Sequence, residues 1–598
     1  MIKISFVLTF FLSIITIFSS IEAINMQEKT NSDPRNIENG LPIYQHGYCD
    51  QPYVVIAKDG TWLCTFTTSS SYEGSKSQYI MATTSKDFGK TWTTPVEIES
   101  PNGQEASWAM PLINENGRIY VFYIYNGDNI RTLPDGKPIR ADMIGWYCYK
   151  YSDDNGKTWS ERHRLPVRIT ACDRANQWKG EVQIMWGIGK PIIYEKSAFF
   201  AFTKLGKYML DDGEGWFFRS DNILTETDVS KIDWQMLPDG EYGLRSSEFG
   251  SVQEEHNIVT LSNGDIYCMY RTVMGYPVNS YSRDGGHTWS KPEIATYANG
   301  RPIKHPRACP RIWKTKNGNY LLWFHNHGGK DFSDRSPAWL SGGIEKNGII
   351  MWSQPEIVLY SHDLSYETGR ISYPDLVEQD GRYWITTTQK TKATVHEIDA
   401  ELLEGLWNQD KICEITQKGL VLSLDQITEN ILNMPTLPNL SEGAFTIDMW
   451  VKFDDLSKDQ VILDSRDESG KGICLSTTEF GTVKIGLNDG KNISNWECDQ
   501  GMLDNKTSHH IVVIVDGYAN IITFVIDGNV CDGEKYRQYG WGRFSESLSD
   551  VNSDAKLRLS VSLKGKLESL RVYDRYLRNS EAIANYNKGK SLREGWSK

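Results

Sequence analysis

One eight-residue pattern, Ser-x-Asp-x-Gly-x-Thr-Trp, occurs three times in the chain and constrains its fold more than any other feature. The copies span residues 85–92, 152–159 and 282–289. In each copy the Asp carboxylate can accept backbone hydrogen bonds, the Gly can adopt a positive φ, and the Trp begins an extended segment. This combination is typical of a hairpin turn fixed by its own side chains. The chain is therefore predicted to be a repeat protein.

A second repeat contains a short strand, a polar turn that usually closes on Gly, and a second strand rich in aromatic and β-branched residues. Its copies begin at Gln51, Met110, Lys190, His256, Cys309 and Tyr373, and the copy at Lys190 lacks the Gly. Their spacing fits blades with long connecting loops, so six markers predict six blades. The longest interval, residues 124–186, leaves room for a seventh. The predicted propeller spans residues 40–412.

The three turns resemble the Asp-box turns of sialidase-like β-propellers. The strands that follow the turns support the resemblance. Each box is followed by a similar outgoing strand, and Trp352 begins a matching strand whose turn has lost its box. The resemblance implies that the Asp and Trp side chains of the boxes hold the blades together at the rim. We therefore expect them to be structural.

The pattern changes after Cys413. Alternating strands are predicted near residues 445–453, 510–516, 521–528 and 565–573. Strands of this kind, separated by turn signals, are typical of a two-sheet sandwich. Residues 425–595 resemble laminin-G-like, concanavalin A-type jelly rolls, which either bind glycans or dock on a catalytic partner. The predicted fold class is therefore all-β: a six- or seven-bladed β-propeller followed by a β-sandwich jelly roll.

Residues 1–23 read as a secretory signal peptide, with Lys3 ahead of an apolar run and a small residue, Ala23, at the end. No Cys follows the cleavage point, so no lipid anchor is predicted. The mature chain is expected to be periplasmic or secreted. Ten cysteines are too few for a disulfide scaffold in a chain of 598 residues, and Cys64 and Cys268 lie in apolar strands, which favours buried free thiols.

The net charge of -13 argues against a general nucleic-acid or anionic-membrane surface. An anionic ligand would have to meet a local cluster of Arg and Lys. The expected partner is an oligosaccharide or polysaccharide, and the sequence leaves the oligomeric state open.

Candidate site residues precede the repeat markers. In a propeller the innermost strands all begin at the same end of the central channel, so these side chains should converge there. They are His46, Tyr48, Asp50, Gln51, Glu105, Ser107, Trp108, Gln183, Trp186, Lys190, Glu254, Glu255, His256, His305, Arg307, Arg311, Arg370, Ser372 and Tyr373, with Arg271 at the end of a second strand. So many His, Arg and carboxylate groups at one mouth indicate a functional site.

Three segments in this set resemble stretches of exo-sialidases. Residues 48–63 match the layout of their "R-I-P … D-G-T-L" opening, residues 255–271 their "E … G … R" stretch, and residues 372–376 their "Y-S-D-L" stretch. Sialidases hold the substrate carboxylate with three arginines, and Asp50-Gln51 stand where the first would be.

The opening of the propeller, residues 45–53, resembles bacterial propeller enzymes that act on rhamnosyl-α-1,4-glucuronate as lyases. In that family a His shortly after the signal peptide is catalytic, and His46 occupies the matching place. Those propellers are seven-bladed. The resemblance implies a uronate substrate and β-elimination.

Elimination at a uronate needs a cation on the carboxylate, a base at C5 and a proton donor for the C4 oxygen. Arg271 and Arg307, with Arg311 or Arg370, can supply the cation. His46 is the predicted base, since an imidazole titrates near neutral pH. Tyr373 or a water is the predicted acid. Predicted substrate-binding residues are Asp50, Gln51, Trp186, Glu255, His256, His305, Arg311 and Arg370.

The sequence therefore predicts an exported carbohydrate-active enzyme that forms an unsaturated uronate as a lyase or a dehydratase. A plant arabinogalactan or a sulfated algal rhamno-uronan such as ulvan would fit. One alternative is a sialidase-type exo-glycosidase with Tyr373 and a Glu as nucleophile pair, the Glu being Glu254 or Glu255. A second is a non-catalytic glycan-binding protein.

The sequence identifies no cofactor, and the metal site is unknown. His325 and His327 could bind a metal together with Cys309, but a polar loop is the favoured interpretation. Family analogy allows a structural Ca²⁺ in the channel or in the jelly roll.

Overall fold

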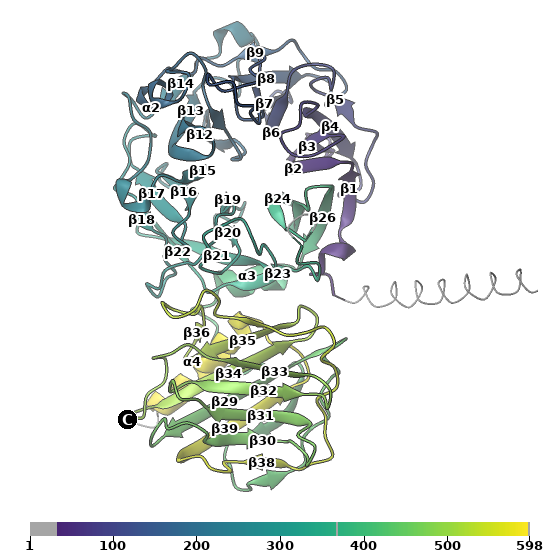
Figure 1. Ribbon diagram of the computed structural model, residues 1–598, viewed down its shortest axis with the longest axis vertical. Coiled ribbons are helices and arrows are strands. Elements are labelled where there is room, and N and C mark those ends of the chain that lie inside the picture. The colour runs from purple at the N-terminus through teal and green to yellow at the C-terminus, as the bar shows by residue number, and fades with distance from the viewer. Residues whose placement is uncertain (1–32, 366–368, 596–598) are drawn as a thin grey trace, which may run out of the picture.

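The computed structural model describes residues 33–365 and 369–595. The predicted signal peptide lies outside these residues. Figure 1 shows a ring of sheets above a separate two-sheet domain. Among the described residues, no helix combines the length and the apolar character needed to cross a bilayer.

The ring consists of six antiparallel sheets. The first three blades contain β2 (Tyr48–Ile56), β3 (Trp62–Ser69), β4 (Tyr79–Ser85) and β5 (Val96–Glu97); β6 (Ala106–Ile113), β7 (Ile119–Tyr125), β8 (Trp146–Ser152) and β9 (His163–Arg164); and β10 (Met185–Trp186), β11 (Ile192–Tyr194), β12 (Ser197–Lys207), β13 (Asp211–Ser220) and β14 (Gln235–Leu237). The interval between residues 124 and 186 holds β8, β9 and their connections, so the prediction of six blades is right and the seventh is absent from the described chain.

The last three blades complete the ring (Figure 1). They contain β15 (Gln253–Thr260), β16 (Ile266–Thr272), β17 (Val278–Ser282) and β18 (Glu293–Ile294); β19 (Arg311–Lys314), β20 (Tyr320–Phe324), β21 (Ala338–Lys346), β22 (Ile349–Trp352) and β23 (Glu356–Leu359); and β24 (Ser372–Gln379), β25 (Arg382–Thr388), β26 (Lys392–Ile398) and β1 (Leu41–Gln45). Strand β1 pairs with β26, so the N-terminal strand closes the ring as the outer strand of the last blade.

The Asp-box turns have the predicted structure. In the first, the Asp87 carboxylate accepts hydrogen bonds from the Thr91 N–H at 2.9 Å and the Thr91 hydroxyl at 2.6 Å. Asp154 and Asp284 make the same contacts with Thr158 and Thr288. Each box joins the third strand of a blade to the short fourth strand. These side chains are therefore structural.

The C-terminal domain is a sandwich of two antiparallel sheets around one apolar core. One sheet contains β27 (Leu420–Leu424), β39 (Gly565–Tyr573), β29 (Ala444–Phe453), β34 (Ser508–Asp516), β35 (Ile521–Ile526), β36 (Asn529–Val530) and β37 (Gly542–Arg543); the other contains β28 (Ile431–Leu432), β38 (Leu557–Leu559), β30 (Val461–Asp464), β31 (Gly472–Thr477), β32 (Val483–Asn488) and β33 (Ile493–Glu497). Alternating apolar residues of both sheets face inward, as in other packed sandwiches.

Short helices complete the chain. They are η1 (Ile37–Asn39), α2 (Ala171–Ala175), η2 (Val229–Lys231), η3 (Ser247–Phe249), α3 (Ala400–Trp407) and α4 (Asn579–Gly595). Nine of the ten cysteines are buried and all are free thiols, as the sequence predicts for Cys64 and Cys268.

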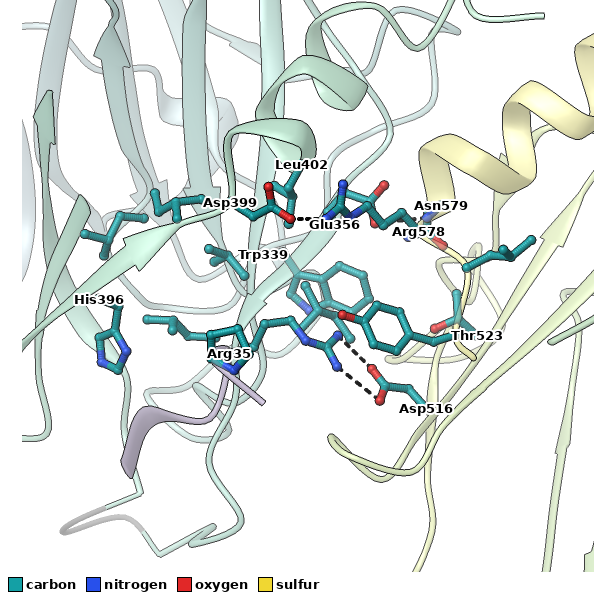
Figure 2. Close-up of a pocket in the computed structure, with 18 of the residues that line it drawn as sticks. Arg35, Trp339, Glu356, His396, Asp399, Leu402, Asp516, Thr523, Arg578 and Asn579 are labelled. Atoms are coloured by element: carbon teal, nitrogen blue, oxygen red, sulfur yellow. Dashed lines mark hydrogen bonds and ion pairs between the residues drawn. The ribbon is translucent and has the colours of Figure 1, made fainter. Parts of the chain in front are cut away.

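The sandwich packs against the fifth blade. Ile521 and Trp541 of the sandwich share an apolar cluster with Phe324, Trp339 and Trp352 of the propeller. Figure 2 shows the polar part of this contact. Arg35 pairs with Asp516 at 2.8 Å, and the Glu356 carboxylate accepts the Asn579 and Ser580 N–H groups at the start of α4. The two domains are joined by both an apolar core and ion pairs.

Candidate active site

The innermost strands of four blades carry the same backbone irregularity near their first residues. Register shifts interrupt β2, β6, β15 and β24, and one residue in each shift has a left-handed φ. These residues are Gln51 (57°), Trp108 (68°), Glu255 (56°) and Tyr373 (46°). A bulge changes the direction in which a side chain leaves the strand, and strained non-glycine residues of this kind concentrate at functional sites. Four equivalent bulges therefore mark one end of the ring.

Two of these bulge residues meet across the ring. The Tyr373 hydroxyl donates a hydrogen bond to Glu255 Oε1 at 2.8 Å. Arg271 Nη1 lies 2.8 Å from the same oxygen. Glu255 Oε2 is buried and has no hydrogen-bond partner in the described structure. Tyr373, Glu255 and Arg271 thus form a connected triad with one carboxylate oxygen unused.

Burial sets the direction of the pKa shift at two members of this triad, and charge sets it at the third. It raises the pKa of Glu255 above its ordinary value, although the charges of Arg271 and Arg335 act in the opposite direction. Burial also raises the pKa of Tyr373, and the Glu255 charge adds to this effect. Burial would lower the pKa of Arg271, but Glu255 and Glu254 outweigh it. The resting site therefore holds a neutral phenol beside a carboxyl group that takes up a proton unusually easily.

Glu254 links two arginines behind the triad. Its Oε2 accepts a hydrogen bond from Arg271 Nε at 2.8 Å and its Oε1 one from Arg307 Nη2 at 2.7 Å. The ring of Phe332 lies 5.6 Å from the Arg271 guanidinium and 4.6 Å from that of Arg307. Among the described residues, the Glu254 carboxylate makes no hydrogen bond to Tyr373 and orients the two arginines instead.

Arg335 is a buried cation whose charge has no carboxylate partner among the described residues. Its Nη1 donates to the Ser372 hydroxyl at 2.9 Å and its Nη2 to the Arg307 carbonyl at 3.2 Å, while its Nε has no partner. Burial lowers the pKa of Arg335, and the neighbouring charges of Arg370 and Arg271 contribute. A buried, unpaired guanidinium among other arginines is suited to an anionic ligand.

Lys390 joins two carboxylates at the other side of Tyr373. Its Nζ lies 2.6 Å from Asp50 Oδ2, 3.1 Å from Glu73 Oε2 and 4.9 Å from the centre of the Tyr373 ring. Arg140 Nη2 is 2.9 Å from Glu73. Burial raises the pKa of Asp50 despite Lys390, whereas at Glu73 the charges of Lys390 and Arg140 outweigh burial and lower the pKa. One ammonium thus connects two carboxyl groups whose proton affinities differ.

The structure brings together about half of the predicted site residues. Tyr373, Glu255, Arg271 and Arg307 are connected by hydrogen bonds and ion pairs, and Lys390 places Asp50 beside them. Gln51 sits at the equivalent bulge of the first blade, with its amide buried and unpartnered. Arg370 is buried, and its charge acts on both Glu73 and Arg335.

Four other predicted residues serve the packing. Trp186 lies in an apolar core between blades, and Arg311 donates to the Ile188 carbonyl at 2.7 Å. His256 packs on Tyr270, and its Nδ1 is 3.1 Å from the Thr203 hydroxyl. His305 Nε2 lies 2.9 Å from the Ala308 carbonyl oxygen. Burial lowers the pKa of both histidines to about 3. Within the described residues, no hydrogen bond or ion pair joins these four side chains to Tyr373, Glu255 or Arg271, although Trp186 shares its apolar cluster with Tyr373.

His46 lies on the turn between β1 and β2, and its side chain is exposed. Its ring centre is 6.1 Å from that of Tyr44. Within the described residues, no ion pair or hydrogen bond connects the His46 ring to an arginine. The role of His46 as a base stays a prediction, and the contacts of the site do not include it.

The sequence rule missed Arg335, Lys390 and Glu73. All three lie on connections between the second and third strands of a blade, not just before an innermost strand. Because strands alternate in direction, these connections reach the same end of the ring. A search for charged residues in the connection between the second and third strands of each blade would have found them.

The histidines considered as metal ligands are used otherwise. His325 Nδ1 is 3.4 Å from the Pro337 carbonyl oxygen and His327 Nε2 is 2.7 Å from that of Asp334. Cys309 contacts the Pro310 carbonyl oxygen. Over residues 33–365 and 369–595, no group of three His, Cys, Asp or Glu side chains is arranged to hold a metal ion.

Comparison with solved structures gives remote similarities. A protein of unknown function from Dyadobacter fermentans is 16% identical, with the match covering 60% of this chain and 98% of that one at a TM-score of 0.44. A Trypanosoma rangeli sialidase is 13% identical, covering 94% and 97% at 0.40. The Hadza microbial sialidase Hz136 is 16% identical, covering 59% and 66% at 0.41.

Family models match both domains. Residues 428–583 match the concanavalin A-like lectin/glucanases superfamily, in agreement with the sandwich. Residues 63–385, more than half of the chain, match the BNR repeat-like domain, whose repeats are the Asp-box turns of the propeller. The chain therefore belongs to the BNR repeat-like family and carries a C-terminal concanavalin A-like domain.

Proposed function

We propose that this protein is an exported glycoside hydrolase that removes a carboxylate-bearing sugar from the end of a glycan. Tyr373 is the nucleophile, Glu255 its base, and Arg271 with Arg335 the binding site for the substrate carboxylate. The observation that carries the proposal is the 2.8 Å hydrogen bond from the Tyr373 hydroxyl to Glu255. Sialidase-type hydrolases are the class of glycosidase in which a tyrosine replaces the usual carboxylate nucleophile.

A tyrosine suits a site that binds a negatively charged sugar. A carboxylate nucleophile would be repelled by the substrate carboxylate, whereas a neutral phenol is not. Because the pKa of Tyr373 is raised, the phenol needs a base to become nucleophilic. Glu255 is in direct contact and can accept that proton. The contact thus supplies a nucleophile that carries little charge until it reacts.

The proposed reaction has two steps. In the first, Tyr373 Oη attacks the anomeric carbon while its proton passes to Glu255, and the bond to the leaving-group oxygen breaks. We assign the proton given to that oxygen to the Asp50–Glu73 pair, since Lys390 connects the two carboxyl groups. In the second step a water attacks the anomeric carbon and gives a proton to the pair, the bond from that carbon to Tyr373 Oη breaks, and Tyr373 recovers its proton from Glu255.

The lyase predicted from the opening segment uses the same arginines differently. They would neutralise a uronate carboxylate while His46 took the C5 proton. We favour hydrolysis because Tyr373 and Glu255 are in contact, whereas His46 is exposed on the β1–β2 turn. Rhamnose- and glucuronate-containing oligosaccharides remain test substrates.

One assay separates the functions. The protein is incubated with α-sialosides and with oligosaccharides that end in or contain glucuronate, and products are followed by mass and by ultraviolet absorbance of unsaturated uronate. Products that together gain one water support hydrolysis. Cleavage without added water, accompanied by new ultraviolet absorbance, identifies a lyase. Loss of water from the substrate identifies a dehydratase, and a glycan that is bound but unchanged identifies a binding protein. The last three results each contradict the proposal.

The nucleophile is tested by Tyr373→Phe, which removes only the hydroxyl. Hydrolysis should fall by about three orders of magnitude or more, since the covalent step is lost. The matched control is Tyr267→Phe, which removes another buried hydroxyl. The Tyr267 hydroxyl, in the fourth blade, accepts a hydrogen bond from Trp352 Nε1 in the fifth blade. Equal activity of the two variants would contradict the assignment.

A further inference from the structure

We propose that the β-sandwich positions Arg335, and so takes part in substrate binding without touching the substrate. Two segments define the contact. The clamp segment, residues 532–543, follows β36 and includes β37 of the sandwich. The arginine segment, residues 325–337, is the connection between β20 and β21 and carries Phe332 and Arg335. The inference rests on the role of Arg335 in the proposed function.

The clamp segment hydrogen-bonds to the backbone at the start of the arginine segment. The Gly328 N–H donates to the Gln538 carbonyl at 2.9 Å, and Trp541 Nε1 donates to the Asn326 carbonyl at 3.0 Å. Trp541 is buried in the apolar cluster shared by both domains. The Tyr539 ring lies 4.9 Å from that of His327 in a stacked arrangement. The sandwich therefore fixes this part of the segment on several sides.

Arg543 holds the other end. Its Nη2 donates to the Ser336 carbonyl at 2.6 Å and lies 3.4 Å from Asp334 Oδ1. Asp334 and Ser336 are the two chain neighbours of Arg335. A side chain of the sandwich thus contacts the backbone on one side of the proposed carboxylate-binding arginine and the neighbouring side chain on the other.

Arg335 depends on its backbone more than the other arginines of the site. Arg271 and Arg307 are oriented by ion pairs with Glu254. Arg335 has no such ion pair in the described part of the chain and relies on the Ser372 hydroxyl and the Arg307 carbonyl. A small shift of its Cα would therefore move the guanidinium, and misplacement of a binding group by about 1 Å is costly in catalysis.

The remainder of the domain contact provides a matched control. Arg578, next to the start of α4, pairs with Asp399 ahead of α3, as Figure 2 shows. This arginine joins the same two domains, but within the described residues it has no hydrogen bond or ion pair with the arginine segment. Loss of Arg578 should weaken docking without moving Arg335.

The test compares Arg543→Ala, Arg543→Lys and Arg578→Ala in the full chain. For a carboxylate-bearing substrate we expect Arg543→Ala to raise KM by roughly tenfold with kcat changed by less than about threefold, since substrate binding is lost in ground and transition states alike. Arg543→Lys, which keeps a donor for the Ser336 carbonyl, should recover most of the loss. Arg578→Ala should keep the wild-type KM.

Hydrogen–deuterium exchange gives a readout that needs no substrate. Amides of residues 325–337 should exchange faster in Arg543→Ala than in the wild type, and at the wild-type rate in Arg578→Ala. Unchanged exchange and KM in Arg543→Ala would overturn the clamp, as would an equal change in Arg578→Ala. A wild-type protein that hydrolyses no acidic sugar would refute the proposed function, while the exchange comparison would still decide whether the sandwich fixes the segment.

Discussion

Replacing Glu255 with Gln removes the base that accepts the Tyr373 proton while keeping the size of the side chain. The Tyr373 hydroxyl can still donate to the amide oxygen, but the amide cannot take up the proton during attack. General-base catalysis contributes about 10²- to 10⁴-fold, so kcat/KM should fall by that factor. This equals about 3–5 kcal/mol in the activation barrier, at about 1.36 kcal/mol per tenfold change.

Glu254→Gln is the matched control, because it makes the same chemical change as Glu255→Gln at the neighbouring position. Each glutamate is fully or almost fully buried and pairs with Arg271. Glu255→Gln removes one buried ion pair and should lower the free energy of unfolding by about 3 kcal/mol, the low end for a broken buried pair, since Arg271 keeps the Glu254 carboxylate. Glu254→Gln removes the ion pairs to both Arg271 and Arg307 and should lower the free energy of unfolding by at least as much. Only Glu255 contacts Tyr373, so Glu254→Gln should retain kcat within about tenfold.

The assay is steady-state hydrolysis of whichever substrate the wild type cleaves, below the melting temperature of both variants. Thermal unfolding is measured in parallel. The wild-type kcat/KM should also rise with pH through a value above 4.5, because the base form of Glu255 is required and burial raises its pKa. If Glu255→Gln kept more than a tenth of the wild-type kcat/KM, or if Glu254→Gln lost as much, the division of roles would be refuted.

Three further results are expected. His46→Ala should leave turnover close to that of the wild type; a loss of two orders of magnitude or more would restore His46 as the base. Asp154→Ala removes hydrogen bonds of the turn and should lower the free energy of unfolding by about 1–2 kcal/mol in thermal melts. The KM measured by steady-state kinetics should stay unchanged. Burial lowers the pKa of His256 from its ordinary 6.5 to about 3. Between pH 3 and pH 6.5 the unfolded chain therefore binds more protons than the folded chain, so the free energy of unfolding should fall as the pH drops from 6.5 toward 3. His256→Gln should flatten that slope in melting curves, and an unchanged slope would exclude His256 as a source.

The ring could be predicted well from the sequence because its turn and strand signals are local. Each repeat marker is specified within ten residues or fewer, so counting the six markers, the Lys190 copy without the Gly included, gives the number of blades. The site was harder to predict. Glu255 and Tyr373 were found because they begin innermost strands, but His256 begins the same strand and faces the packing between blades. Successive residues of a strand point to opposite faces, and the bulge at Glu255 determines which one reaches the site.

The arginine and lysine that complete the site could not be found by the same rule. Arg335 and Lys390 occupy connections whose length and path depend on the whole ring, and the support of Arg335 comes from Arg543, more than two hundred residues away in the chain. The signal for Lys390 was equally weak, since a single lysine in a short turn is usually solvated. Contacts of this kind are set by tertiary structure and leave no local pattern.

The closure of the ring by β1 has a consequence for the order of assembly. Among the strands of the ring, Leu41–Gln45 is synthesised first, yet its partner, β26, is made only with the last blade. Until then the earliest strand has no neighbour to pair with. Arg35, six residues upstream, must wait longer still, because Asp516 belongs to the sandwich. Residues 35–45 thus gain these partners only after the last blade and the sandwich have been made, and one short segment contacts both domains.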